Sequence, residues 1–210
     1  MEFKVIFKTS RKATIELIDG GIYFADEPYR VYVDGKLHSE SKLVVHTIDG
    51  LKPDTAYEVY IENASERSDI QQIKTDYEFV TLDVRRFGAK GDGEHDDTIF
   101  IQAAINACPK DSRVWIPEGV YKVSSLFLKS DITIDIDEGA VISAYTDRAK
   151  FPILPGLIES YDETREYNLG TWEGNPLNMF ASIITGINVS NVVITGRGTI
   201  DGNASFENWW

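Results

Sequence analysis

Carboxylates gather in one short stretch, GAKGDGEHDD, which carries Asp92, Glu94, Asp96 and Asp97. Paired carboxylates can serve as a general acid and a general base, and alternating acidic residues can bind calcium. Directly after this stretch the sequence becomes apolar at helical spacing. The stretch could therefore be a catalytic pair, a calcium loop or the capped start of a helix.

The spacing favours the structural interpretation. Adjacent residues at a helix start point about 100° apart around the axis, so Asp96 and Asp97 do not converge on one substrate atom. As a calcium loop starting at Asp92, the stretch has Asp97 where the EF-hand needs glycine and Ala103 where it needs glutamate. We expect Asp96 or Asp97 to cap the first helical amides, with the glycines allowing the tight turns before them.

The helix that these residues introduce is predicted over 100–108, in FIQAAINAC. Ile101, Ala104, Ile105 and Cys108 follow the i, i+3, i+4, i+7 pattern of one apolar face. Such a helix could cover the open end of a solenoid, whose first coil has an apolar interior to protect.

Composition excludes several classes of function. A net charge of −13 argues against nucleic acid, because phosphate binding needs clustered cations. The single cysteine, Cys108, excludes an internal disulfide, and His38, His46 and His95 give no zinc-ligand spacing with it. No apolar run approaches the roughly 20 residues of a membrane span. We expect a cytoplasmic protein, or a secreted one from which a leader was removed.

Residues 1–78 read as short strands at close spacing: EFKVIF, ATIELI, YRVYVDG, LVVHTI, YEVYIENA and IQQIKT. Asp-Gly in VDGK favours a hairpin turn leading to a short edge strand over 37–41. In GLKPDTAYEVYI, the residues at every second position resemble the corner of fibronectin type III domains where a tyrosine hydroxyl, here that of Tyr57, bonds the backbone upstream. We expect a sandwich of this type and assign it no activity.

Residues 79–210 follow a different pattern. KSDITIDIDEGAVISA from Lys129 aligns with VSNVVITGRGTIDGN from Val189, matching Asp131 with Asn191 and Ile134 with Ile194. An earlier half-copy, VWIPEGVYKV, places Gly119 twenty residues before Gly139. Strand, turn, strand units of this length predict a parallel β-helix.

The stretch over 145–182 fits no coil and is predicted to be a long excursion from one edge, where function is often found. Trp172 and Tyr167 lie in it and are the candidate substrate-binding residues, although such aromatics often only attach a loop to the core. Trp209 and Trp210 are interpreted as packing groups.

Three stretches in order carry a family resemblance: FGAKGDGEHDDTIFIQAAINAC, VWIPEGVYKVSSLFLKSDITIDIDEGAVI and NVVITGRGTIDGNASFENWW. Over residues 83–210 the chain resembles the amino-terminal part of glycoside hydrolase family 28, the polygalacturonases and related pectin hydrolases. A fibronectin type III module ahead of such a β-helix resembles the exo-acting members. The implied fold is all-β: a sandwich over 1–78, then the first coils of a right-handed parallel β-helix over 79–210 with a capping helix at its amino-terminal end.

The resemblance implies inverting hydrolysis of galacturonan, with carboxyl groups roughly 6.5 to 9.5 Å apart so that a water fits opposite the leaving group. Family members carry these groups in Asn-Thr-Asp and Asp-Asp motifs, followed by His-Gly and Arg-Ile-Lys motifs, on later coils. None of these motifs follows Gly198 here. We therefore predict no catalytic residue in the chain, with those of the parent protein lying beyond residue 210, and no cofactor or metal.

The expected partner of the parent protein is galacturonan, with the 210 residues inactive alone. The alternative is a β-helix protein that binds carbohydrate without turnover, as phage adhesins do. A solenoid whose last coil is uncovered also predicts self-association through that end.

Overall fold

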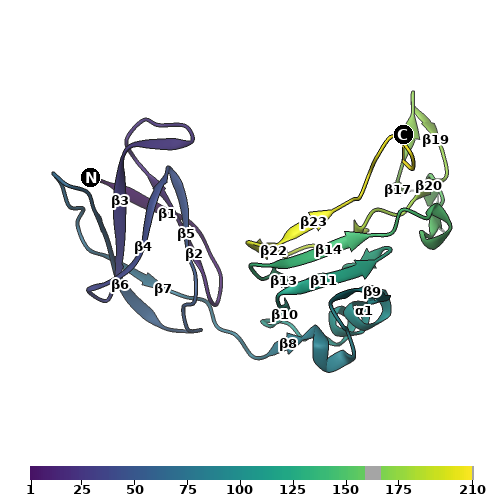
Figure 1. The fold of residues 1–210 in the computed structure, drawn as a ribbon, viewed down its shortest axis with the longest axis horizontal. Coiled ribbons are helices and arrows are strands. Elements are labelled where there is room, and N and C mark those ends of the chain that lie inside the picture. The colour runs from purple at the N-terminus through teal and green to yellow at the C-terminus, as the bar shows by residue number, and fades with distance from the viewer. Residues whose placement is uncertain (159–166, 210) are drawn as a thin grey trace. The chain divides into compact units, whose positions relative to one another are not determined.

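A computed structural model describes residues 1–158 and 167–209. The chain forms two compact units, Met1–Glu78 and Phe79–Trp210, coloured purple to blue and teal to yellow in Figure 1. In the described residues, no helix is long and apolar enough to cross a membrane.

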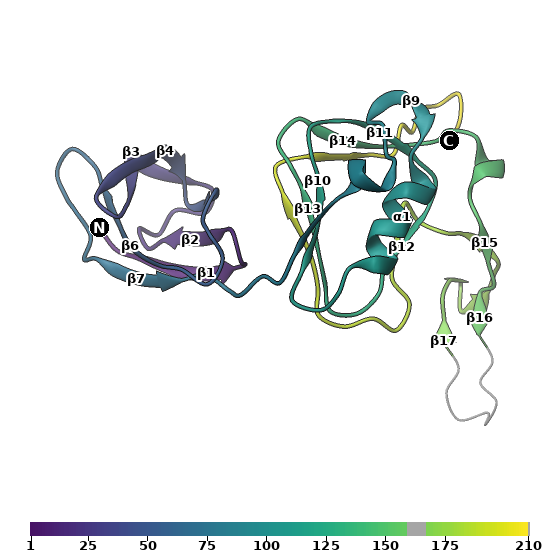
Figure 2. The ribbon, with the colours of Figure 1, turned by 90° about the horizontal axis from the view of Figure 1, so that it is seen from below.

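The first unit is a sandwich of two antiparallel sheets (Figures 1 and 2). Its strands are β1 (Phe3–Lys8), β2 (Ala13–Leu17), β3 (Phe24–Val33), β4 (Lys36–Leu43), β5 (Val45–Ile48), β6 (Ala56–Glu62) and β7 (Gln71–Lys74). One sheet has the order β1-β2-β5 and the other β4-β3-β6-β7. The predicted hairpin joins β3 to β4 through Asp34 and Gly35, both at positive φ. Strand β4 is longer than predicted, because its pairing with β3 continues beyond residue 41 to Phe24 and Leu43.

The two sheets are held together by apolar side chains that alternate along each strand and pack between the sheets. Along β2, Ala13, Ile15 and Leu17 are buried while the residues between them are partly exposed. They share one apolar core with Val31 of β3 and Ile61 of β6. Each aliphatic side chain buried in this way contributes roughly 1.5–3 kcal/mol.

Tyr57, near the start of β6, stabilises the turn that leads into this strand. Its hydroxyl accepts a hydrogen bond from the backbone N–H of Lys52 at 2.7 Å. This bond and the strand order support the fibronectin type III interpretation of residues 1–78, which stays a prediction.

The second unit contains three parallel sheets, and the predicted parallel β-helix is confirmed (Figures 1 and 2). The first sheet has the order β22-β13-β10-β8, and its strands are β8 (Thr81–Asp83), β10 (Arg113–Ile116), β13 (Ile132–Ile136) and β22 (Val192–Gly196). The second has the order β23-β14-β11-β9, with β9 (Asp92–Asp96), β11 (Gly119–Val123), β14 (Ala140–Ala144) and β23 (Thr199–Asp201). The third pairs β12 (Leu126–Phe127) with β21 (Ile184–Thr185).

The register of the coils follows the sequence repeats. Ile134 pairs with Ile194, as the internal alignment predicts. At one corner the left-handed positions are taken by Asp111, Asp131 and Asn191, and the Asn191 amide donates to the Asp131 carboxylate at 2.8 Å. Asp and Asn occupy this backbone region more readily than other non-glycine residues.

The glycine repeat is offset by one residue. Gly119 pairs with Ala140 rather than with Gly139, and its N–H donates to the Gly139 carbonyl at 3.2 Å. The turn that precedes β14 is therefore one residue longer than the turn that precedes β11.

Helix α1 (Thr98–Ala107) packs its apolar face into the β-helix core, as predicted. Ile101, Ala104 and Ile105 are buried, and Cys108, the C-cap rather than a helical residue, is buried beside them. Burial raises the pKa of the Cys108 thiol, as expected for a small buried apolar group. A short 3₁₀ helix, η1 (Val84–Phe87), lies against α1.

The described residues of the excursion, 145–158 and 167–182, form small hairpins outside the coils, as predicted (Figure 2). They begin with a 3₁₀ turn, η2 (Arg148–Lys150), and contain three antiparallel pairs of two-residue strands. The pairs are β15 (Ile153–Leu154) with β20 (Met179–Phe180), β16 (Leu157–Ile158) with β17 (Tyr167–Asn168), and β18 (Thr171–Trp172) with β19 (Asn175–Pro176).

Candidate functional site

The acidic stretch at residues 88–97 is structural. Asp97 is fully buried, and its carboxylate accepts from the backbone N–H groups of Lys90 at 2.6 Å and Gly91 at 3.0 Å. Asp96 accepts from the N–H of Thr98 at 3.0 Å and from its hydroxyl at 2.6 Å. Asp96 thus bonds the first helical residue, as predicted for one of the two.

The prediction that Asp97 could cap the helix is wrong. Asp97 occupies the N-cap position but makes no side-chain bond to a helical amide. Its carboxylate points instead to the glycine loop, where it accepts from two partly buried backbone N–H groups. The stretch also contributes strand β9, which the sequence did not indicate.

Asp92 holds the turn inside this stretch. Bonds from the backbone N–H groups of His95 and Glu94 hold the pKa of Asp92 at about 2, below its ordinary value. Its second oxygen lies 2.6 Å from Nδ1 of His95. These oxygens are engaged within the turn, and in residues 1–158 and 167–209 no group of three or more potential ligands could hold a metal ion.

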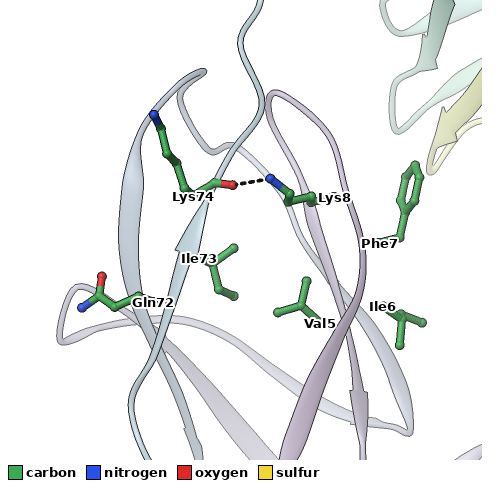
Figure 3. Close-up of a pocket in the computed structure, with 7 residues that line it drawn as sticks. All are labelled: Val5, Ile6, Phe7, Lys8, Gln72, Ile73 and Lys74. Atoms are coloured by element: carbon green, nitrogen blue, oxygen red, sulfur yellow. Dashed lines mark hydrogen bonds between the residues drawn. The ribbon is translucent and has the colours of Figure 1, made fainter.

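A groove of about 580 Å³ lies between β1 and β7 in the first unit (Figure 3). Figure 3 shows Val5 and Ile73 facing each other in it, with Lys8 bonded to the Lys74 carbonyl at 2.9 Å. Both ammonium groups have carboxylate partners, Asp76 for Lys8 and Asp54 for Lys74. Because β1 and β7 end their sheets, the groove is the open edge of the sandwich.

Cations and aromatic rings converge at one corner of the β-helix. We call Lys122, Tyr145, Arg148, Lys150 and Trp209 the corner cluster. Strand β11 supplies Lys122, and Tyr145 directly follows β14. The turn η2 supplies Arg148 and Lys150, and Trp209 follows β23 through a short loop. Stacking of successive coils therefore brings these side chains together.

Two ammonium groups share the ring of Tyr145. Nζ of Lys122 lies 5.5 Å and Nζ of Lys150 5.1 Å from the ring centroid. Burial, and then the neighbouring charge of Asp96, raise the pKa of Tyr145 and keep the phenol neutral. An exposed cation–π contact is worth about 0.5–1 kcal/mol, so the ring orients the two cations but does not neutralise them.

Trp209 forms the other half of the corner cluster. Its ring packs edge-on against Phe151 at 5.5 Å and Phe180 at 5.9 Å, and the Arg148 guanidinium lies 5.2 Å from its centroid. Arg148 also donates to the Asn208 carbonyl at 2.6 Å. Trp209 therefore packs, in agreement with its interpretation from sequence, while Trp210 lies outside the described residues.

The sequence-predicted binding residues lie elsewhere in the excursion. Trp172, in β18, is 69% exposed, and no ring contact is found for it in the described part of the chain. Tyr167, in β17, pairs through its backbone with Ile158. Both stay candidates for binding substrate.

The members of the corner cluster other than Trp209 were not recognised from sequence. One signal was available, because YTDRAKF places an aromatic ring, Arg148 and Lys150 within seven residues directly after a predicted strand. The other partners, Lys122 and Trp209, are separated from it by tens of residues, and only the coil register places them nearby.

Comparisons with known proteins identify the family of the second unit. A family model described as "Rhamnogalacturonase A/epimerase, pectate lyase-like" matches residues 81–208. An exo-poly-alpha-D-galacturonosidase from Dickeya chrysanthemi is 30% identical over 192 residues, which cover 85% of this chain and 31% of that protein. The chain thus spans about a third of this curated relative.

One further similarity is to a solved structure, and another is to a shorter stretch of sequence in a protein with a different name. The structure of a family 28 exopolygalacturonase from Yersinia enterocolitica matches with a TM-score of 0.62 at 24% identity, covering 97% of this chain and 41% of that one, which supports the fold. The plasmin and fibronectin-binding protein A of Streptococcus pneumoniae is 40% identical over 88 residues, 39% of this chain and 12% of that protein.

The resemblance to glycoside hydrolase family 28 seen in the sequence is thereby confirmed. With residues 81–208 matched and the three parallel sheets in place, the chain belongs to the pectate lyase-like β-helix family of rhamnogalacturonase A and its epimerase relatives.

Proposed function

We propose that a protein containing this chain hydrolyses α-linked galacturonan, acting from chain ends without a metal or organic cofactor. The observation that carries the proposal is the match to an exo-poly-alpha-D-galacturonosidase, because it extends over 85% of the chain and so is not confined to the β-helix motifs. The cations of the corner cluster, which have no carboxylate partner among the described residues, also suit a polyanionic substrate.

The proposed reaction inverts the anomeric carbon. One carboxylic acid would protonate the leaving oxygen while a carboxylate activates a water on the opposite face of the sugar. In this chain the adjacent pair Asp96 and Asp97 is committed to the Thr98 and glycine-loop bonds, and no family catalytic motif follows Gly198. We therefore propose that the 210 residues alone are inactive and that the acid and base belong to further coils of the parent protein.

The test is to express the gene product that contains this chain, and the 210-residue chain separately, and assay both on polygalacturonate. We expect galacturonate release with an inverted anomeric configuration, read by proton NMR, from the longer product only. Release by the 210-residue chain would show that the proposed location of the catalytic residues is wrong. No release by the longer product would refute the hydrolase assignment.

A second function has one observation in its favour. The 88-residue match to a plasmin and fibronectin-binding protein shows that related sequence occurs in a protein named for binding. A non-catalytic binding protein would retain polygalacturonate without shortening it. Size analysis of the recovered polysaccharide separates this outcome from hydrolysis.

A further inference from the structure

We propose that the corner cluster binds the carboxylates of an acidic oligosaccharide, with Lys122, Lys150 and Arg148 as the charged contacts. The identity of the sugar as galacturonate rests on the proposed function. The recognition of a sugar acid rests on the geometry of the corner cluster itself.

The first argument is charge. In a chain of net charge −13, several cations elsewhere pair with carboxylates, as Lys4 does with Glu16 at 2.8 Å and Arg11 with Glu78 at 2.7 Å. Within the described part of the chain, none of the three cluster cations has a carboxylate within ion-pair distance. Three cations that have no carboxylate partner among the described residues favour an anionic ligand.

The second argument is the ring surface beside the cations. Tyr145, whose ring contacts two of the cations, is partly exposed, and Phe206, in the loop after β23, is 92% exposed. Aromatic faces can pack against the apolar C–H faces of a sugar while charged groups contact its carboxylate. Inorganic anions would use the cations alone, so the combination indicates a sugar acid.

The third argument is preorganisation. Asn203 donates to the Ser143 hydroxyl and to the Ala144 carbonyl, both at 2.7 Å, which fixes the loop after β23 on the end of β14. Asn208 accepts from the N–H groups of Ser205 at 2.9 Å and Trp209 at 2.6 Å. On the facing turn, Asp147 accepts from the N–H of Ala149 at 3.0 Å. Both loops are thus held by their own hydrogen bonds, which lowers the entropy cost of binding.

The experiment is calorimetric titration of the 210-residue chain with a galacturonic acid trimer and, separately, with its neutral methyl ester. Lys122→Met, Arg148→Met and Lys150→Met each remove one charge and keep an apolar stem. We expect the trimer to bind the unchanged chain, the ester to bind more weakly, and each variant to lose about tenfold in affinity, or about 1.4 kcal/mol, because each variant removes one charged contact.

Lys110→Met is the matched control, since Lys110 is exposed and precedes β10, at the corner marked by Asp111. It should bind the trimer like the unchanged chain, and Lys122→Arg should recover most of the affinity lost in Lys122→Met. Tryptophan fluorescence checks that each variant is folded. Equal binding of trimer and ester, unchanged affinity in all three variants, or no binding of the trimer would each overturn the proposal.

The outcome is separable from that of the proposed function. If the longer gene product hydrolyses polygalacturonate but the corner cluster does not bind the trimer, the hydrolase assignment stands and this inference is wrong. If the corner cluster binds the trimer but the longer product releases no galacturonate, the inference stands and the hydrolase assignment is wrong.

Discussion

Two adjacent aspartates have different roles because their side chains leave the backbone in different directions. Asp97 turns inward and satisfies two backbone N–H groups of the glycine loop, whereas Asp96 remains exposed and bonds Thr98. A buried N–H group without an acceptor costs about 1–3 kcal/mol, while the exposed groups near Asp96 can use water instead. Burial, and not residue type, therefore decides which carboxylate matters for stability.

The same substitution at both positions tests this difference. Asp97→Asn replaces one acceptor oxygen by a donor that faces a backbone N–H, and we expect it to lower the free energy of unfolding by about 1–3 kcal/mol. Asp96→Asn keeps an oxygen for Thr98 and should change stability by less than about 0.5 kcal/mol.

Urea unfolding followed by tryptophan fluorescence measures the free energy of unfolding of the second structural unit, which contains both aspartates. All four tryptophans, at positions 115, 172, 209 and 210, belong to the second unit. Equal stabilities of the two variants would contradict the role assigned to Asp97.

At the scale of elements, the backbone just before β9 lies close to β11 at Gly91, and this contact aligns β9 with the coils. Gly91 has φ of +63°, and a Cβ there would lie 2.8 Å from the ring of Tyr121, which is fully buried under it. The Gly91 carbonyl accepts from the N–H of Val120 at 2.9 Å, which joins the loop to β11. A side chain at Gly91 would separate the two segments.

Gly91→Ala should therefore destabilise the second unit more than Gly93→Ala. Both glycines have positive φ, so both substitutions carry the backbone penalty, but a Cβ at Gly93 meets Val120 at an ordinary 3.4 Å. The overpacking against Tyr121 adds about 1–3 kcal/mol for Gly91→Ala alone. The difference between the two unfolding midpoints measures it, and equal midpoints would show that Tyr121 can move aside freely.

At the scale of the whole molecule, the last coil exposes apolar positions that earlier coils bury. Ile134 and Ile142 are 3% and 0% exposed, whereas their partners in the next coil, Ile194 and Ile200, are 45% and 43% exposed. Strands β22 and β23 are the end strands of their sheets and offer unpaired backbone groups. Such an edge pairs readily with another chain.

We expect the 210-residue chain to self-associate through this face. Ile194→Lys places a charge on the face and should shift the chain toward monomer, while Ile99→Lys, at a 69% exposed position on α1, should not. Light scattering over a concentration series measures the mass of each protein. A monomer at every concentration for the unchanged chain would show that this face does not mediate self-association.

The sequence by itself determined the elements and their repetition. Turn residues and alternating apolar positions predicted the strands of the first unit and strands β10, β11, β13, β14, β22 and β23 of the second. The 3.6-residue period predicted the helix. These signals could be used because they depend on neighbours along the chain. The match of Asp131 to Asn191 and of Ile134 to Ile194 predicted the coil register for the same reason. The match of several ordered stretches indicated the family.

Only the tertiary structure decided which residues meet. The corner cluster joins Lys122 and Lys150 through the ring of Tyr145, and Arg148 to Trp209. These side chains meet because parallel coils stack in register and the excursion begins and ends at the same corner. It also decided that Asp97 rather than Asp96 is buried, and that GDGEHD pairs as a strand with β11. Local patterns hold no information on contacts between distant segments, since those form only when the packing of the whole β-helix fixes their separation.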